Sequence, residues 1–278
     1  MPETAGQRRF FLVGIFGFVV NRILDMLDQI GAVFLLLIEA IRWIIRSVTR
    51  KKVRIGRSAI VSQIVRVGVR SIFIISLVSG CVGLILVLQM SPPLDKFGSK
   101  DYVANITGVA ILRELGPLIA SIVLTGFAGA AITAEIGTMV VGEEIEALEA
   151  HALNPVRFLV VPRVIATVIS MTALAVIADV VAVVCGLFMG TVGLGIPFQR
   201  YVDNTLDQLK AVDFYTGIGK AVVFGLLIGL IACSNGLRVS GGAAGVGKAT
   251  TNTVVQSIVS IIFADLIFTA VFYSLKLV

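Results

Sequence analysis

The chain has 278 residues, of which 57% are hydrophobic and only 14% are charged, and its mean hydropathy is +1.01. A soluble domain carries about 25% charged residues, so this composition excludes a water-soluble globule and makes lipid the solvent for much of the chain. The net charge of +6 is interpreted first as a topology signal, and we expect no nucleic-acid partner.

The N-terminal region, residues 1–66, is predicted to be a helical cytoplasmic or interfacial segment. Its opening run QRRFFLVGIFGFVV resembles a signal peptide, but no small-x-small cleavage site follows, so we expect it to be retained. Residues 22–50 alternate polar and apolar side chains at helical spacing, which is typical of an amphipathic helix in the headgroup layer. The alternative is a poorly spanning helix, which Glu39 and the basic end of the segment disfavour.

Five apolar runs follow, at about residues 67–90, 108–134, 160–190, 217–237 and 254–276. Each is near the length of about 20 residues that a helix needs to cross a bilayer. Residues 67–278 are therefore predicted to form an all-α, five-span membrane domain. The densest positive cluster, RKKVRIGR followed by Arg66 and Arg70, borders the first run. Because such flanks stay in the cytoplasm, we expect a cytoplasmic N-terminus and a C-terminus on the outer side.

The loop between the second and third spans, GTMVVGEEIEALEAHALNP, is the most informative connection. Its apolar residues recur at helical spacing and acidic residues line another face, which predicts a short amphipathic helix at about residues 138–153. Such a helix suits docking into a groove on a soluble partner; a solvated helix that only connects two spans fits the periodicity equally well. The residues singled out are Glu143, Glu144, Ile145, Glu146, Leu148 and Glu149.

Residues 240–250, SGGAAGVGKAT, match the G-x-x-x-x-G-K spacing of a phosphate-binding loop. A true phosphate loop follows a buried strand and places Ser or Thr directly after the Lys. Here Ala249 takes that position, and predicted spans flank the motif on both sides. We interpret the stretch as a Gly-rich cytoplasmic turn that holds Lys248 near the inner headgroups.

Ionisable residues inside or near the spans are functional candidates, because a charge in lipid is expensive. Arg113 and Glu114 begin the second span, Asp179 lies inside the third and Asp265 inside the fifth. A structural ion pair that holds the bundle together explains them equally well.

Nothing in the sequence indicates catalysis by this chain. It has neither H-E-x-x-H nor G-x-S-x-G, and the lone His151 cannot make a metal site by itself. Cys81, Cys185 and Cys233 lie in apolar runs without paired spacing and are interpreted as small buried hydrophobes. We expect no catalytic residue, no metal and no bound cofactor.

Four motifs together resemble the MlaE/YrbE family, the permeases of ABC transporters that work with MCE proteins. They are LRELGP, TAEIGTMVVGEEIEAL, NPVRFLVVPRV and GVGKATTNTVVQS, and the resemblance runs from about residue 20 to the C-terminus. It implies a homodimer in the bacterial inner membrane, with a cytoplasmic ABC ATPase that binds ATP and Mg, and a ring of MCE-domain proteins. Such a system moves phospholipids or related lipids between the inner and outer membranes and maintains outer-membrane lipid asymmetry.

The resemblance also implies roles for particular residues. It makes the acidic loop helix the coupling helix that fits a groove on the ATPase. It joins Arg113, Glu114, Lys248 and Asp265 in a charged network beside the lipid cavity, near the cytoplasmic side. Phe127 stands where relatives often have Arg, a departure that removes a cation from that position. We expect the cavity to lie between two copies, lined by the first, second and fifth spans.

Two other functions remain open on the sequence. One is a stand-alone secondary transporter driven by ions through Asp179 and Asp265, and the other is a membrane scaffold that transports nothing. An ABC permease should co-purify with an ATPase, whereas an ion-coupled carrier should work alone.

Overall fold

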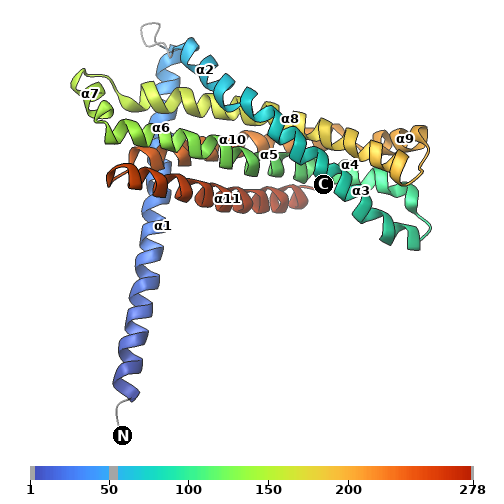
Figure 1. Cartoon of the computed structure of the whole chain (residues 1–278), viewed down its shortest axis with the longest axis horizontal. Coiled ribbons are helices and arrows are strands. Elements are labelled where there is room, and N and C mark those ends of the chain that lie inside the picture. Colours follow the sequence, from blue (N-terminus) through green and yellow to red (C-terminus); the bar gives the residue numbers. More distant parts are fainter. Residues whose placement is uncertain (1–3, 50–55, 277–278) are drawn as a thin grey trace.

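The computed structural model describes residues 4–49 and 56–276, and every regular element within those ranges is helical. Long helices lie side by side, with α7 at one end of the bundle and α9 at the other (Figure 1). The first elements are α1 Thr4–Thr49, α2 Arg57–Val67, η1 Val69–Ser71, α3 Ile72–Lys96, η2 Lys100–Tyr102, α4 Val103–Ala110, η3 Ile111–Leu115, α5 Gly116–Leu124 and η4 Thr125–Gly129. Then follow α6 Ala130–Val141, α7 Glu144–Ala150, η5 Val156–Val160, α8 Val161–Phe188, η6 Met189–Gly193, α9 Phe198–Gln208, α10 Ala211–Leu237 and α11 Gly242–Ser274.

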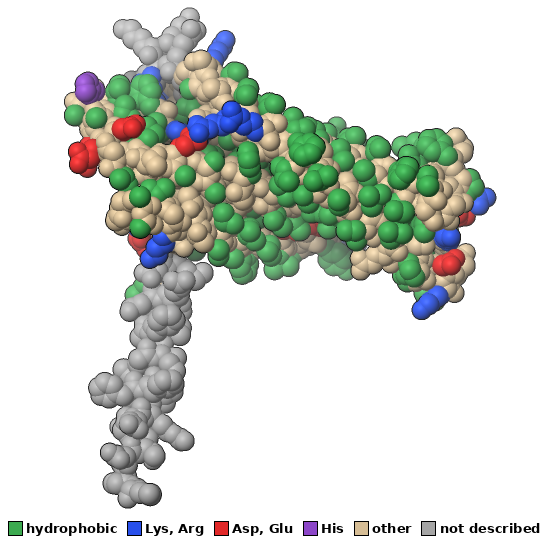
Figure 2. All heavy atoms as spheres, in the orientation of Figure 1, with side chains coloured by type: hydrophobic (Ala, Val, Ile, Leu, Met, Phe, Trp, Pro, Cys, Tyr) green, Lys and Arg blue, Asp and Glu red, His purple; other side chains and the backbone are tan. Residues whose placement is uncertain are grey.

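The five predicted spans are confirmed, and so is the all-α membrane fold. Helices long and apolar enough to cross a bilayer run over Arg57–Lys96, Lys100–Val141, Val156–Gly193, Ala211–Leu237 and Gly242–Ser274. All five are longer than the apolar runs in the sequence, because helical hydrogen bonding continues past the hydrophobic residues. Hydrophobic side chains cover the middle of the bundle, and charged side chains gather mostly toward its two ends (Figure 2).

Helix α1 crosses the long axis of the bundle near the end that carries α7 (Figure 1). A helix that lies in the plane of a membrane has this orientation relative to helices that cross the membrane. The place of α1 in the headgroup layer stays a prediction. Its second half packs on the bundle through buried Ala40, and Asn154 Nδ2 donates a hydrogen bond to Glu39 Oε1 over 3.2 Å. The side chains of residues 4–23, and residues 50–55 of the RKKVRIGR cluster, lie outside the described residues.

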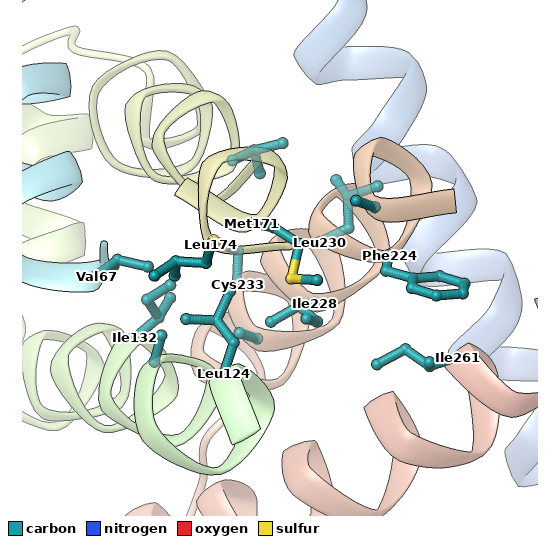
Figure 3. Close-up of a cluster of buried hydrophobic side chains, with 14 of the residues drawn as sticks. Val67, Leu124, Ile132, Met171, Leu174, Phe224, Ile228, Leu230, Cys233 and Ile261 are labelled. Carbon is teal, nitrogen blue, oxygen red and sulfur yellow. The ribbon is translucent and has the colours of Figure 1, made fainter. Parts of the chain in front are cut away.

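The hydrophobic core forms where the second span, α8, α10 and α11 meet. Leu124, Ile132, Met171, Phe224 and Ile228 point into it (Figure 3). Since lipid tails are as apolar as these side chains, close van der Waals packing holds such helices together.

Glycines allow the closest helix contacts. A Cβ added at Gly83 of α3 would lie 2.1 Å from the carbonyl oxygen of Ala182 on α8. A Cβ at Gly225 of α10 would lie 2.9 Å from the Cβ of Met171 on α8. Small residues at these positions therefore set the spacing of α3, α8 and α10.

Candidate functional site

The acidic loop forms α7, a seven-residue helix at one end of the bundle (Figure 1). The side chains of Glu143, Glu144, Glu146 and Glu149 are exposed, whereas Ile145 and Leu148 are half-buried. Ile145 packs against the hydrophobic core, so the apolar face attaches α7 to the bundle and the carboxylates face outward. This arrangement leaves an acidic ridge available to a cationic groove on another protein.

The predicted bounds of this helix, 138–153, were too wide. Residues up to Val141 continue α6, and Glu143 adopts a left-handed backbone with φ of 58° that separates α6 from α7. Ala152, also at positive φ, follows the end of α7. Val141 and Ala152 therefore do not belong to its apolar face, which consists of the single pair formed by Ile145 and Leu148.

A cluster of ionisable residues lies inside the bundle around Lys220 of α10, which is 1% exposed. Its Nζ lies 2.6 Å from Glu114 Oε2 of η3 and 2.9 Å from Asp265 Oδ1 of α11. Nζ also donates a hydrogen bond over 3.1 Å to the hydroxyl of Thr269, which in turn donates to Glu114 Oε1 over 2.8 Å. The three N–H groups of the ammonium thus face three oxygens from two other spans.

Local backbone features bring these side chains together. η3 is a π-helical turn, a distortion that is frequent at functional sites, and it is followed by Pro117, which has no backbone N–H to donate. A Cβ at Gly217 of α10 would lie 2.3 Å from the carbonyl oxygen of Leu112, so only glycine lets α10 approach η3 this closely. Lys220 lies about one turn further along α10 and therefore faces Glu114.

Arg113 has a different partner from its neighbour Glu114. Its Nε lies 2.5 Å from Oδ1 of buried Asp213, near the start of α10. Asp213 Oδ2 also accepts a hydrogen bond from the backbone N–H of Lys210 over 2.9 Å. Arg113 thus attaches the second span to the capped N-terminus of α10, which is the structural role of an ion pair.

Lys248 does not belong to this network, which corrects the expectation drawn from the resemblance. It is exposed in the second turn of α11, and its distance from Asp265 along the helix is 17 residues, about 25 Å. Gly247 and Lys248 lie within a helix rather than in a loop that could wrap a phosphate. The ammonium that the network requires comes from Lys220.

The depth of the cluster also differs from the expectation. Lys220 lies nine residues after the first residue of α10, the helix that directly follows α9 in the chain, whereas α7 is at the opposite end of the bundle from α9 (Figure 1). The cluster therefore lies in the half of the bundle away from α7, the helix that is expected from the sequence on the cytoplasmic side.

Lys220, Asp213 and Thr269 were missed in the sequence. Lys220 carried a usable signal, because a lone Lys in the run TGIGKAVVFG is an intramembrane charge. Asp213 precedes the apolar run at 217–237 and so lies outside every predicted span, and a threonine in an apolar helix gives no signal of its own.

Asp179 of α8 is buried, and its Oδ1 has no hydrogen-bond partner among the described residues. It packs against Gly116, where an added Cβ would lie 1.6 Å from Oδ1. Asp265 instead contacts Lys220, so the structure places the two aspartates against different elements.

A second charged group lies toward the α7 end of the bundle. Glu135 of α6 forms ion pairs with two arginines. Its Oε1 lies 2.5 Å from Arg66 Nη2, and its Oε2 lies 3.3 Å from Arg163 Nη2. Phe127 of η4, the residue that replaces a cation expected from the resemblance, lines a pocket together with Arg66 and Arg70. Two guanidinium groups from the first span therefore line the pocket beside Phe127, a position at which the second span supplies no cation.

Comparisons with known proteins agree with this architecture. The family described as Permease MlaE matches residues 60–271. A probable ABC transporter permease protein of Rickettsia felis is 32% identical over 262 residues, covering 94% of this chain and 99% of that protein. One from Rickettsia prowazekii is 35% identical over 216 residues, or 78% and 83% of the two chains. Protein TRIGALACTOSYLDIACYLGLYCEROL 1, chloroplastic, of Arabidopsis thaliana is 33% identical over 211 residues, or 76% of this chain and 60% of that protein.

Proposed function

Because the chain belongs to the MlaE permease family and is a multi-pass ABC transporter permease, we propose that it moves phospholipids or related lipids between the inner and outer membranes of a bacterium. It works in the inner membrane as a homodimer, on a separate cytoplasmic ATPase that binds ATP and Mg, and with MCE-domain proteins on the periplasmic side. The observation that carries the proposal is the family match across all five spans. The relative named for a galactosylated diacylglycerol supports lipid as the substrate class.

An apolar route is the physical requirement for such a transporter. Each buried CH₂ group contributes about 0.8 kcal/mol, so bringing two acyl chains into water would cost roughly 20 kcal/mol or more. Helix α11 presents an unpaired apolar face: Phe263, Leu266 and Ile267 are each more than 60% exposed in the single chain. We assign this face to the contact with the second copy and to the wall of a cavity that shelters acyl chains.

The ridge on α7 supports docking to the ATPase. Its carboxylates are exposed at the end of the bundle opposite α9 and are positioned by the half-buried Ile145. Closure of an ATPase dimer would move the two copies of α7, and the packed spans would carry that movement to the cavity. The N-terminus would then be cytoplasmic and the C-terminus periplasmic.

The Lys220 cluster has two roles in this account. It holds α10, α11 and the second span in register, because the buried ammonium of Lys220 contacts Glu114 of the second span and Asp265 of α11. It also presents Glu114, whose side chain is 36% exposed, beside the route that the lipid takes.

No observation favours the ion-coupled carrier, because Asp179 and Asp265 do not form a chain of ionisable groups. The decisive assay is purification of the tagged chain with its natural partners, followed by mass spectrometry of proteins and lipids. We expect an ABC ATPase, MCE-domain proteins and diacyl lipids in the complex. A purified chain that carries neither ATPase nor lipid would contradict the proposal.

A further inference from the structure

A polar cavity lies apart from the Lys220 cluster, between the first and second spans. Its volume is about 160 Å³. It is toward the α7 end, because Glu135 lies only six residues before the end of α6. Its polar and apolar lining includes Gln63, Arg66, Arg70, Glu135, Phe127 and Ile132.

The cavity carries an excess of positive charge. Arg66 and buried Arg163 both pair with Glu135, so two guanidinium groups share one carboxylate. Arg70 adds a third guanidinium that is exposed and has no ion pair with any residue in the described ranges. Such a group favours an anion, and planar guanidinium groups bind phosphate oxygens through paired hydrogen bonds.

The apolar surroundings indicate what carries that anion. Arg66 lies at the end of α2 and Arg70 in the 3-10 turn η1, and both line the pocket. Phe73 and Leu77 follow in the first two turns of α3, four residues apart and therefore on one face of that helix. Phe73 is 78% exposed and Leu77 is 54% exposed, so an apolar surface follows the basic residues along the span. A free phosphate ion uses only the basic residues, whereas a phospholipid uses both surfaces.

The pocket also offers a place for a headgroup donor. Gln63 Oε1 is buried and accepts no hydrogen bond within the described part of the chain. A hydroxyl or ammonium group beyond the phosphate would satisfy it, and buried acceptors gain from such a partner.

We propose that this pocket binds the phosphate-bearing headgroup of a phospholipid in the cytoplasmic leaflet, held by Arg66 and Arg70, with its acyl chains along Phe73 and Leu77. The site is distinct from the Lys220 cluster. Its leaflet and ligand class rest on the proposed function, but lipid binding at rest can be measured without ATP-driven transport, so the two can fail separately.

Native mass spectrometry of the purified full-length complex tests this site. The probes are dioleoyl phosphatidylglycerol, uncharged dioleoylglycerol and inorganic phosphate. We expect phosphatidylglycerol to bind in preference to dioleoylglycerol, and Arg66→Gln with Arg70→Gln to weaken its binding about tenfold, since each cation near an anionic headgroup contributes independently. The matched control, Arg42→Gln with Arg57→Gln, removes two exposed cations outside the pocket and should leave binding within about twofold.

A single variant separates binding from folding. Arg70→Gln breaks no ion pair of the described chain, so it should weaken phosphatidylglycerol binding about threefold while the thermal midpoint stays unchanged. Equal losses in the control pair, or no loss in either pocket variant, would overturn the proposal. Displacement of the lipid by millimolar inorganic phosphate would identify a free-phosphate site instead. Dissociation of the dimer with unchanged lipid per chain would identify a subunit interface, and either result also overturns it.

Discussion

Replacing Lys220 with Met tests whether this side chain organises the intramembrane cluster. The substitution keeps a long side chain but removes the ammonium, which leaves the carboxylates of Glu114 and Asp265 close together without a counter-ion. Breaking a buried ion pair by removing one partner costs about 3–5 kcal/mol. Glu114 is 36% exposed and Asp265 16%, so water relieves part of the penalty, and we expect a loss near the lower end, about 3 kcal/mol.

Thermal unfolding of the purified complex in one detergent measures this effect. We expect the midpoint to fall by roughly 5 °C or more in Lys220→Met, on the scale that relates free energy to midpoint in domains of this size. The triple variant with Glu114→Gln and Asp265→Asn should recover most of the loss, because a neutral cluster leaves no unpaired charge. A Lys220→Met midpoint within about 1 °C of the native value would refute the reasoning.

Three further experiments test the coupling helix, the helix packing and the rival function. Glu143→Lys with Glu146→Lys reverses charge on the exposed ridge of α7 and should weaken ATPase association about tenfold in a pull-down titration; unchanged affinity would remove the docking role. Gly83→Ala should destabilise the bundle by about 1–3 kcal/mol, because the added Cβ meets a backbone carbonyl, whereas Gly126→Ala, which meets nothing within 4 Å, should leave the thermal midpoint unchanged. Asp179→Asn should retain ATP-driven lipid transfer in proteoliposomes; loss of transfer with normal assembly would favour an ion-coupled carrier.

Sequence pattern predicted the spans because a hydrocarbon layer imposes a single length scale on every crossing helix. It also placed an amphipathic helix in the acidic loop. The bounds of that helix could not be predicted, because the break depends on the positive φ of Glu143, and glutamate rarely adopts this conformation.

The composition of the charged cluster required three-dimensional information. The sequence identified Glu114 of the second span and Asp265 of the fifth as intramembrane charges, but their common partner Lys220 belongs to the fourth span. That partnership depends on how closely Gly217 lets α10 approach η3. Lys248 was assigned to the cluster from a resemblance between sequences, and the rise of α11 places it about 25 Å away along the helix.

Lipid transfer between two vesicle populations by the reconstituted complex is the most direct test of the central claim. The account predicts transfer of fluorescent phospholipid that requires this chain, its ATPase partner and ATP together, and that is insensitive to collapse of ion gradients. Transfer by the chain alone in an ion gradient, or ATP hydrolysis by the chain purified without its partner, would contradict it.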